Sequence, residues 1–370
     1  MQTFPPIPNP KRILLGPGPS LADPRVLAAL AQPLISHLDP EFLKLMAQVQ
    51  EQLRFVFETH NELTLAVPGT GSAAMETAVA ALVEEGTPTL VCVIGYFGNR
   101  IAEMARIYKA DLTVLQKPMG EIFQPDEIRA ALQQKPAKVV AIVQAETSTG
   151  VLQPIKEIAE IVHAQGGLLI VDAVTSLGGV QVAVDANGID VCYSCSQKCL
   201  GCPPAISPIT FNPAAVDYVN HRKTPIASWY LDITRLAKYW GAEHAYHHTA
   251  SSPLVYGLSE GLHIIQEEGL PARFDRHLSN ARLLWQGLQK LGLELFVPEN
   301  YRLPTLTTVR IPEGVDDAAF RKQLLEKYNI EVSGGLGDLK GKIWRIGLMG
   351  YSSREENVQL LLSALGDLLN

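Results

Sequence analysis

The chain has 370 residues, of which 47% are hydrophobic and 19% charged, and its formal net charge is −7. This length can bury one large and one smaller core, and the composition is that of an ordinary globular protein. An acidic chain with no long run of one charge is not expected to bind nucleic acid, and no apolar stretch is long enough to span a membrane. The N-terminus lacks the basic-then-apolar pattern of a secretory signal, so we expect a cytoplasmic protein.

Strands and helices alternate through most of the chain. An amphipathic helix is predicted at 40–59, where apolar residues recur every three or four positions, and it could line the core or a subunit interface. Strands are then predicted at 63–67, 89–94, 138–143, 168–172, 188–192 and 206–211, and helices at 73–83, 154–165, 213–221, 254–268 and 271–291. This alternation predicts a mostly parallel sheet with helices on both faces, where ligands bind beyond the carboxyl ends of the strands.

The pattern changes after about residue 292. Strands are predicted at 306–311, 330–332 and 343–346, and helices at 317–328 and 354–369, an order that indicates a small α+β domain. We therefore expect an α/β protein with three parts. They are an N-terminal arm with an active-site loop at 1–22, a large domain at 23–270 and a small C-terminal domain at 271–370.

Two charged residues stand at the ends of predicted buried strands. Lys198 lies among small, weakly polar residues after the strand at 188–192. Lysine avoids such sites unless it is paired or chemically used, and burial would lower its pKa and make it an amine nucleophile, with a Schiff base to an aldehyde cofactor as the first use to consider. Asp172 closes another apolar strand, where it could cap the next turn or face a cationic ring nitrogen.

Other candidate ligand-binding features each allow a plainer interpretation. The segment Gly69–Ser72 opens a predicted helix and could form an anion cup or only a helix cap. Phe97 could stack on a planar ligand or belong to the core. Arg345 interrupts an apolar strand, either at a sheet edge or offering its guanidinium to a carboxylate. The Gly- and Pro-rich loop at 14–20 is either a turn or a rigid wall beside a ligand.

Four cysteines have a spacing that could suggest a metal or iron–sulfur site: Cys192-x-x-Cys195-x-x-x-Cys199-x-x-Cys202. A tetrahedral site needs convergent thiols, usually on a Gly-containing knuckle turn. The residues between the first two cysteines favour a strand instead, in which these thiols point to opposite faces. We interpret the cysteines as small residues packed close to a cofactor and expect no metal.

Taken together, these residues resemble the class V aminotransferases of fold type I, and most closely the alanine–glyoxylate, or serine–pyruvate, aminotransferases. The resemblance extends from residue 14 to the C-terminus. It is carried by Leu15-Gly16-Pro17-Gly18-Pro19-Ser20, Glu146-Thr147-Ser148-Thr149-Gly150-Val151-Leu152-Gln153-Pro154, Ser176-Leu177-Gly178-Gly179, Ser194-x-Ser196-Gln197-Lys198, Tyr246-His247-His248-Thr249 and Arg345-Ile346-Gly347-Leu348.

The resemblance implies pyridoxal 5′-phosphate as cofactor, a large domain that binds it, and a homodimer with shared active sites. Lys198 would form the Schiff base and move the substrate proton, and Asp172 would pair with the pyridinium nitrogen. Cofactor contacts fall on Thr70, Gly71, Ser72, Phe97, Thr147, Asp172, Gln197 and Lys198, and on Tyr246 and Thr249 from the other subunit. Substrate contacts fall on Gly18, Thr147 and Arg345.

The implied reaction is ping-pong transfer of an amino group from alanine or serine to glyoxylate, which gives glycine and a 2-oxo acid. No second cationic group is evident for a dicarboxylic side chain, which argues for small neutral donors. A 3-hydroxykynurenine transaminase shares nearly every motif. A cysteine desulfurase typically has His where this chain has Gln197 and Phe97. A cysteine-cluster metal protein is the alternative from a different class.

Overall fold

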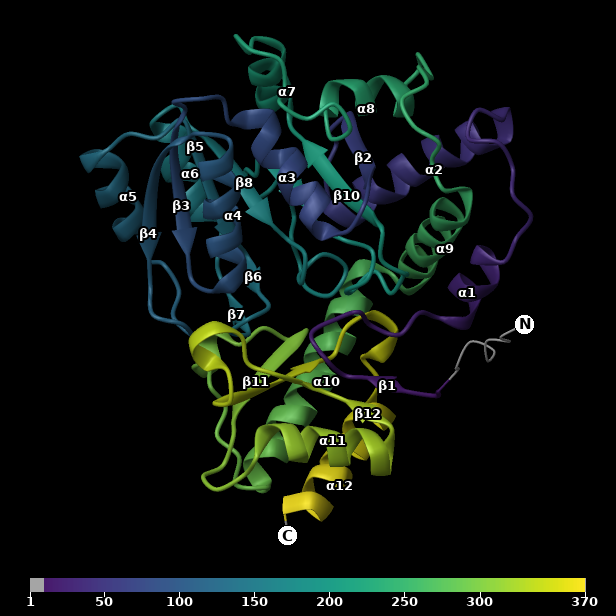
Figure 1. Ribbon diagram of the computed structural model, residues 1–370, viewed down its shortest axis with the longest axis vertical. Helices are drawn as coiled ribbons and strands as arrows, with labels where there is room; N and C mark the ends of the chain where they lie inside the picture. Colours follow the sequence, from purple (N-terminus) through teal and green to yellow (C-terminus); the bar gives the residue numbers. More distant parts are fainter. Residues whose placement is uncertain (1–9, 370) are drawn as a thin grey trace, which may run out of the picture.

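The computed structural model describes residues 10–369, which form a larger part built on one sheet and a smaller part below it (Figure 1). The first nine residues of the expected N-terminal arm lie outside the described residues, and so does Asn370. The segment considered for a secretory signal is among those nine, so the structure says nothing about it.

A seven-stranded sheet forms the centre of the larger part. Its order is β2-β10-β9-β8-β5-β3-β4. The bounds are β2 Leu63–Pro68, β3 Pro88–Val93, β4 Asp111–Gln116, β5 Val139–Val143, β8 Leu168–Asp172, β9 Val191–Tyr193 and β10 Ile206–Phe211. Only β10 runs antiparallel to its neighbours, so the predicted mostly parallel sheet is confirmed.

Helices cover both faces of this sheet. Because strand–helix–strand crossovers are right-handed, α3 (Gly71–Leu82) and α4 (Tyr96–Ile107) cover one face, and α5 (Pro125–Gln134) and α6 (Lys156–Ala164) cover the other. The remaining helices of the larger part are α1 (Pro24–Leu30), α2 (Pro40–Phe57), α7 (Pro213–Asn220), α8 (Ile233–Trp240) and α9 (Ser252–Glu268). Helix α2 packs against β2 and α9 through its apolar face.

The sequence pattern predicts no element between residues 94 and 138, where the structure has α4, β4 and α5. Strand β4 is a half-exposed edge strand, so it lacks a strong apolar signal. Helix α4 starts with Tyr96-Phe97-Gly98, and these residues are weak helix formers. Its start depends on a contact from a distant segment, described below.

The smaller part has its own apolar core. Strands β11 (Leu306–Arg310), β14 (Ile343–Gly347) and β13 (Ser333–Gly334) form an antiparallel sheet, and β1 (Ile13–Leu14) pairs in parallel with β12 (Ile330–Glu331). Helices α11 (Asp317–Tyr328) and α12 (Glu355–Leu369) pack together beside α10 (Leu270–Lys290). The first residues of α10 pack into the apolar core of the larger part, and its later turns pack into the core of the smaller part. This helix therefore connects the two parts.

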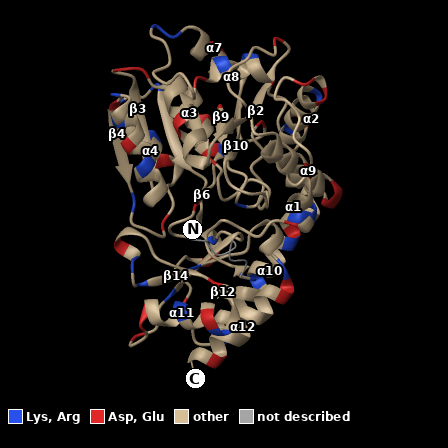
Figure 2. Ribbon diagram, turned by 45° about the vertical axis from the view of Figure 1, so that its right-hand side comes forward, with Lys and Arg blue, Asp and Glu red and all other residues tan. Residues whose placement is uncertain are grey.

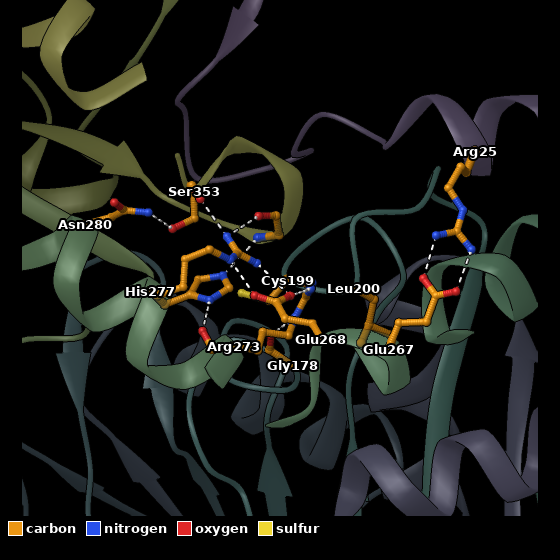
Figure 3. Close-up of polar contacts among 12 residues, drawn as sticks. Arg25, Gly178, Cys199, Leu200, Glu267, Glu268, Arg273, His277, Asn280 and Ser353 are labelled. Atoms are coloured by element: carbon orange, nitrogen blue, oxygen red, sulfur yellow. Dashed lines mark hydrogen bonds and ion pairs between the residues drawn. The ribbon is translucent and has the colours of Figure 1, made fainter. Parts of the chain in front are cut away.

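A buried charge cluster at the start of α10 ties the chain after β9 to the smaller part (Figure 3). Arg273 donates hydrogen bonds to the backbone oxygen of Cys199 (2.6 Å) and to Glu268 (2.7 Å). Arg276 donates to the same Glu268 (2.6 Å) and to the backbone oxygen of Ser353 (2.6 Å). Because both cations share one carboxylate, the turn that follows Lys198 is held against the segment that follows β14.

Acidic and basic residues are interspersed over the surface helices (Figure 2). Among residues 10–369, no helix combines the length and the apolar character needed to cross a membrane.

Candidate active site

A cavity of about 290 Å³ opens where the parallel strands end. Most of the predicted ligand-binding residues line it: Gly18, Thr70, Gly71, Ser72, Phe97, Asp172, Gln197 and Lys198. They come from the loop before α1 and from the segments that follow β2, β3, β8 and β9. The carboxyl ends of the sheet strands thus bring distant parts of the sequence together, as expected for an α/β sheet.

The Lys198 side chain is held by the Gly- and Pro-rich loop. Its Nζ donates a short hydrogen bond to the backbone oxygen of Pro17. Gly18 has a φ of +108°, and a Cβ at this position would lie 2.6 Å from Cδ of Lys198. Burial lowers the pKa of Lys198, and the positive charge of Arg345 acts in the same direction. A larger share of the amine is therefore neutral and able to act as a nucleophile.

Asp172 is buried at the end of β8, with 2% of its surface exposed. Its Oδ1 accepts a hydrogen bond from the backbone N–H of Val174 (2.9 Å), so Asp172 caps the next turn through one oxygen, as one of the two alternatives predicts. Its Oδ2 accepts from the hydroxyl of Tyr193 (2.9 Å), a neighbour in the β8–β9 register that the sequence analysis missed. Burial raises the pKa of Asp172 to about 7. Among the described residues this carboxylate forms no ion pair, although the nearby Lys198 lowers its pKa, and a cation in contact with it would stabilise it.

The segment at 69–72 has the features of an anion site. Helix α3 begins at Gly71, two residues before its predicted start, and Thr70 occupies the N-cap without a side-chain capping hydrogen bond. Its hydroxyl and the first N–H groups of α3 are therefore free to bind a ligand. The Gln197 side-chain oxygen is buried nearby without a hydrogen-bond partner among the described residues. Ser72 Oγ accepts a hydrogen bond from Arg100 (3.1 Å), a cavity residue that was not predicted.

Glu146 fixes the position of Phe97. Its buried carboxylate accepts hydrogen bonds from the backbone N–H of Phe97 (3.2 Å), from that of Gly98 (3.3 Å) and from the Ser148 hydroxyl (2.6 Å). It therefore caps the N-terminus of α4, where a negative charge is favourable. Burial raises the pKa of Glu146, and these hydrogen bonds oppose the rise. The guanidinium of Arg100 lies 5.0 Å from the Phe97 ring centre.

Arg345 lies in β14, the middle strand of the small sheet, and is 6% exposed. The edge-strand alternative for this arginine is therefore wrong. Arg345 Nε donates to the backbone oxygen of Gly334 (2.8 Å) and Nη1 to that of Thr147 (3.4 Å). No described carboxylate forms an ion pair with it. Burial lowers the pKa of Arg345 to about 10.

Thr147 and Arg345 contact each other, but neither is among the residues that line the cavity. The hydroxyl of Thr147 shares a hydrogen bond with that of Thr175 (2.5 Å).

Two predicted residues lie away from the cavity within one chain. Tyr246 is 63% exposed and its ring contacts that of His37, with a centroid distance of 5.2 Å. Thr249 is also exposed. We expect these residues to act in another subunit, because a single chain does not bring them to the cavity that holds Lys198.

Three of the four cysteines of the spaced motif pack against different segments. Cys195 lies against Gly71, Cys199 Sγ lies 3.5 Å from the backbone oxygen of Thr175, and Cys202 Sγ lies 3.4 Å from that of Gly257. All are buried. Within residues 10–369, no group of three or more His, Cys, Asp or Glu side chains is arranged to hold a metal ion.

Comparison with known proteins shows the family. The family model described as "Aminotransferase class-V" matches residues 14–361. An alanine–glyoxylate aminotransferase of Rattus norvegicus is 42% identical over 368 residues, covering 98% of this chain and 89% of the relative. An (S)-ureidoglycine–glyoxylate transaminase of Bacillus subtilis is 37% identical over 375 residues, covering 96% of this chain and 90% of the relative. The crystal structure of an alanine–glyoxylate aminotransferase from Nostoc sp. matches with a TM-score of 0.98 and 50% identity, covering 100% of this chain and 98% of that one.

The residues present fit the cofactor of this family. A lysine with a lowered pKa, a buried carboxylate that a cation would stabilise and the N-terminus of α3 with its Thr70 cap all face one cavity. They correspond to the aldehyde, the pyridinium nitrogen and the phosphate of pyridoxal phosphate. The chain therefore belongs to the class V aminotransferases and is a pyridoxal-phosphate-dependent aminotransferase of fold type I.

Proposed function

We propose that this enzyme transfers the amino group of alanine or serine to glyoxylate, in a ping-pong reaction that yields a 2-oxo acid and glycine. The observation that carries the proposal is the buried Arg345, which has no carboxylate partner among the described residues yet is close enough to influence Lys198. A buried guanidinium in this position suits the carboxylate that every amino acid and 2-oxo acid carries. Two similar proteins, from Rattus norvegicus and Bacillus subtilis, both have glyoxylate in their names, which supports the acceptor.

Pyridoxal phosphate, when bound, supplies an aldehyde for Schiff-base formation and an electron-withdrawing ring. Lys198 provides the amine that binds the cofactor and then moves a proton from and to the substrate Cα. The hydrogen bond to Pro17 and the close contact with Gly18 orient its side chain. Its lowered pKa favours the neutral amine, which both tasks require.

Asp172 would hold a proton on the ring nitrogen of the bound cofactor. Its carboxylate is fixed by Tyr193 and by the backbone N–H of Val174, so it does not need to reorganise during the reaction. Phe97, which Glu146 holds in place, would pack its ring against the cofactor ring. Thr70, Gly71, Ser72 and Gln197 would bind the phosphate, and the family resemblance assigns Thr147 to the ring oxygen.

The choice of a small neutral donor rests on the relatives more than on charge. The expectation that no second cation serves a dicarboxylic side chain stays a prediction, although Arg100 lines the cavity. Its contacts, however, are with Ser72 and Phe97, at the end of the cavity that carries the anion site. Arg345 contacts Thr147 instead. We therefore propose that Arg100 serves the anion site and not a donor side chain.

The donor can be tested with a panel of amino acids. The purified enzyme would be assayed with alanine, serine, aspartate, 3-hydroxykynurenine and (S)-ureidoglycine, each against glyoxylate and pyruvate, and with cysteine for sulfide release. We expect the highest kcat/KM for alanine or serine with glyoxylate. A preference for (S)-ureidoglycine would favour the second candidate function, which the similarity to the Bacillus subtilis transaminase suggests. A preference for aspartate or 3-hydroxykynurenine, or sulfide release as the main activity, would refute the proposal.

We also propose a cytoplasmic homodimer in which Tyr246 and Thr249 complete the phosphate site of the partner. Large exposed apolar side chains support this, because Tyr246 (63% exposed) contacts the segment that carries Leu34 (73% exposed) and Leu38 (42% exposed). Apolar surface of this kind is typical of a protein–protein interface.

Subunit complementation tests the shared site. Lys198→Ala and the double variant Tyr246→Ala/Thr249→Ala would be assayed separately and after co-expression. If the sites are shared, a mixed dimer contains one site with an intact Lys198 and an intact Tyr246, so activity returns. If all three residues act within one chain, the mixture is no more active than the two parents.

A further inference from the structure

Arg100 is a cation without a counter-ion in the cavity of the proposed active site. It is partly buried, and within residues 10–369 its side chain forms one hydrogen bond, from Nη1 to Ser72 Oγ (3.1 Å). No carboxylate of the described residues lies within ion-pair distance of it. Its guanidinium packs over the rings of Tyr96 (5.4 Å) and Phe97 (5.0 Å). Arginines that leave water usually have a partner of opposite charge.

The local structure aims this guanidinium at the anion site. Residues 96, 97 and 100 share one face of α4, because they are three and four positions apart. Ser72 is the second residue of α3, the helix whose N-terminus forms that site. The contact between the two helices therefore places a fixed positive charge beside Thr70, Gly71 and Gln197, which line the same cavity. An oxyanion with several acceptor atoms suits the four N–H donors that Ser72 leaves free.

We infer that Arg100 binds the phosphate group of the cofactor and that Ser72 acts through its hydroxyl to orient this guanidinium. The Ser72 side chain thereby has a defined role. The inference depends on the cofactor of the family and not on the donor or the acceptor, so it can fail or hold independently of the proposed reaction. A phosphate carries nearly two negative charges at neutral pH, and the α3 N-terminus supplies only a partial positive charge. Arg100 supplies the full charge that the site otherwise lacks.

The test compares pyridoxal phosphate with pyridoxal, which has the same ring and aldehyde but no phosphate. Cofactor would be removed from the full-length enzyme, and each compound titrated back while tryptophan fluorescence and the visible absorption of the bound cofactor are followed. For Arg100→Met, we expect a dissociation constant for pyridoxal phosphate about ten- to a hundredfold higher than for the wild type, and an unchanged constant for pyridoxal. Inorganic phosphate should compete with pyridoxal phosphate less strongly in this variant.

Three further variants separate charge, orientation and folding. Arg100→Lys keeps the charge but loses the planar fork, so its loss of affinity should be smaller than that of Arg100→Met. Ser72→Ala keeps the backbone N–H and removes the hydroxyl, so its loss should also be smaller. Arg106→Met, at an exposed position of the same helix, is the matched control and should bind both compounds like the wild type. Urea unfolding of every variant checks that the fold is kept.

The outcomes are distinct. Equal losses for pyridoxal phosphate and pyridoxal would mean that Arg100 only supports the aromatic rings, and would overturn the inference. An unchanged affinity for pyridoxal phosphate, with a raised KM for aspartate alone, would place Arg100 on the substrate side and would also overturn it. A loss that appears only with the phosphorylated compound supports it.

Discussion

For Asp172 we predict that one substitution lowers the activity of the enzyme but raises the stability of the cofactor-free protein. Burial raises the pKa of this carboxyl from its ordinary 3.8 to about 7, although Val174 and Tyr193 donate hydrogen bonds to it. The folded protein therefore binds this proton more tightly than the unfolded chain does. In the cofactor-free protein, the contribution of Asp172 to the free energy of unfolding is therefore fully present below about pH 4 and is lost as the pH rises towards 7.

The size of the effect follows from the pKa. One pKa unit corresponds to about 1.36 kcal/mol, so the rise from 3.8 to about 7 makes the buried, ionised carboxylate cost roughly 4 kcal/mol above pH 7. Asn has nearly the same shape and no charge. Its side-chain oxygen can still accept from the Val174 N–H, and its amide can donate to the Tyr193 hydroxyl. We therefore expect Asp172→Asn to stabilise the cofactor-free protein at pH 8 by roughly 2–4 kcal/mol.

Urea unfolding of cofactor-free wild type and Asp172→Asn at pH 4.5, 6 and 8, at one protein concentration, measures this. The two proteins should have similar stability at pH 4.5 and diverge as the pH rises. The variant should meanwhile lose most of its transamination activity, because an amide cannot hold the ring nitrogen protonated. Parallel stability curves from pH 4.5 to 8 would refute the reasoning, since the carboxyl would then not be costly when ionised.

Two further substitutions test residues around Lys198. Arg345→Lys should raise KM roughly 10- to 100-fold for every amino-acid donor, because one ammonium cannot replace the bidentate guanidinium. Steady-state kinetics with alanine and serine measures this, and an unchanged KM would remove Arg345 from the substrate site. Gly18→Ala puts a Cβ 2.6 Å from Lys198 Cδ at a φ of +108°, which strains the backbone by about 1–3 kcal/mol and displaces the lysine. It should weaken the visible absorption of the lysine-bound cofactor, and an unchanged spectrum with normal activity would contradict the packing described.

Much of the fold and the main chemical groups could be predicted from the sequence. Lys198 and Asp172 stand out because charged residues end apolar runs, and a strand end is where an α/β sheet binds ligands. The sheet strands of the large part are apolar and bounded by turn residues, so their positions follow from local pattern, except for the half-exposed β4. The motif of four cysteines shows the limit of such reasoning, because spacing alone does not say which segment each thiol contacts.

The family, and the positions of Lys198 and Asp172 at strand ends as candidate nucleophile and candidate partner of the ring nitrogen, follow from residue type and local order. What surrounds these two residues depends on tertiary contacts. Tyr193 meets Asp172 through the register of β8 and β9, which no local pattern specifies. Arg100 reaches the cavity because α4 begins at Tyr96, and that start depends on the carboxylate of Glu146, some fifty positions away in the chain. Contacts between distant segments set the positions of Tyr193 and Arg100. The residues next to them in the sequence do not specify these contacts.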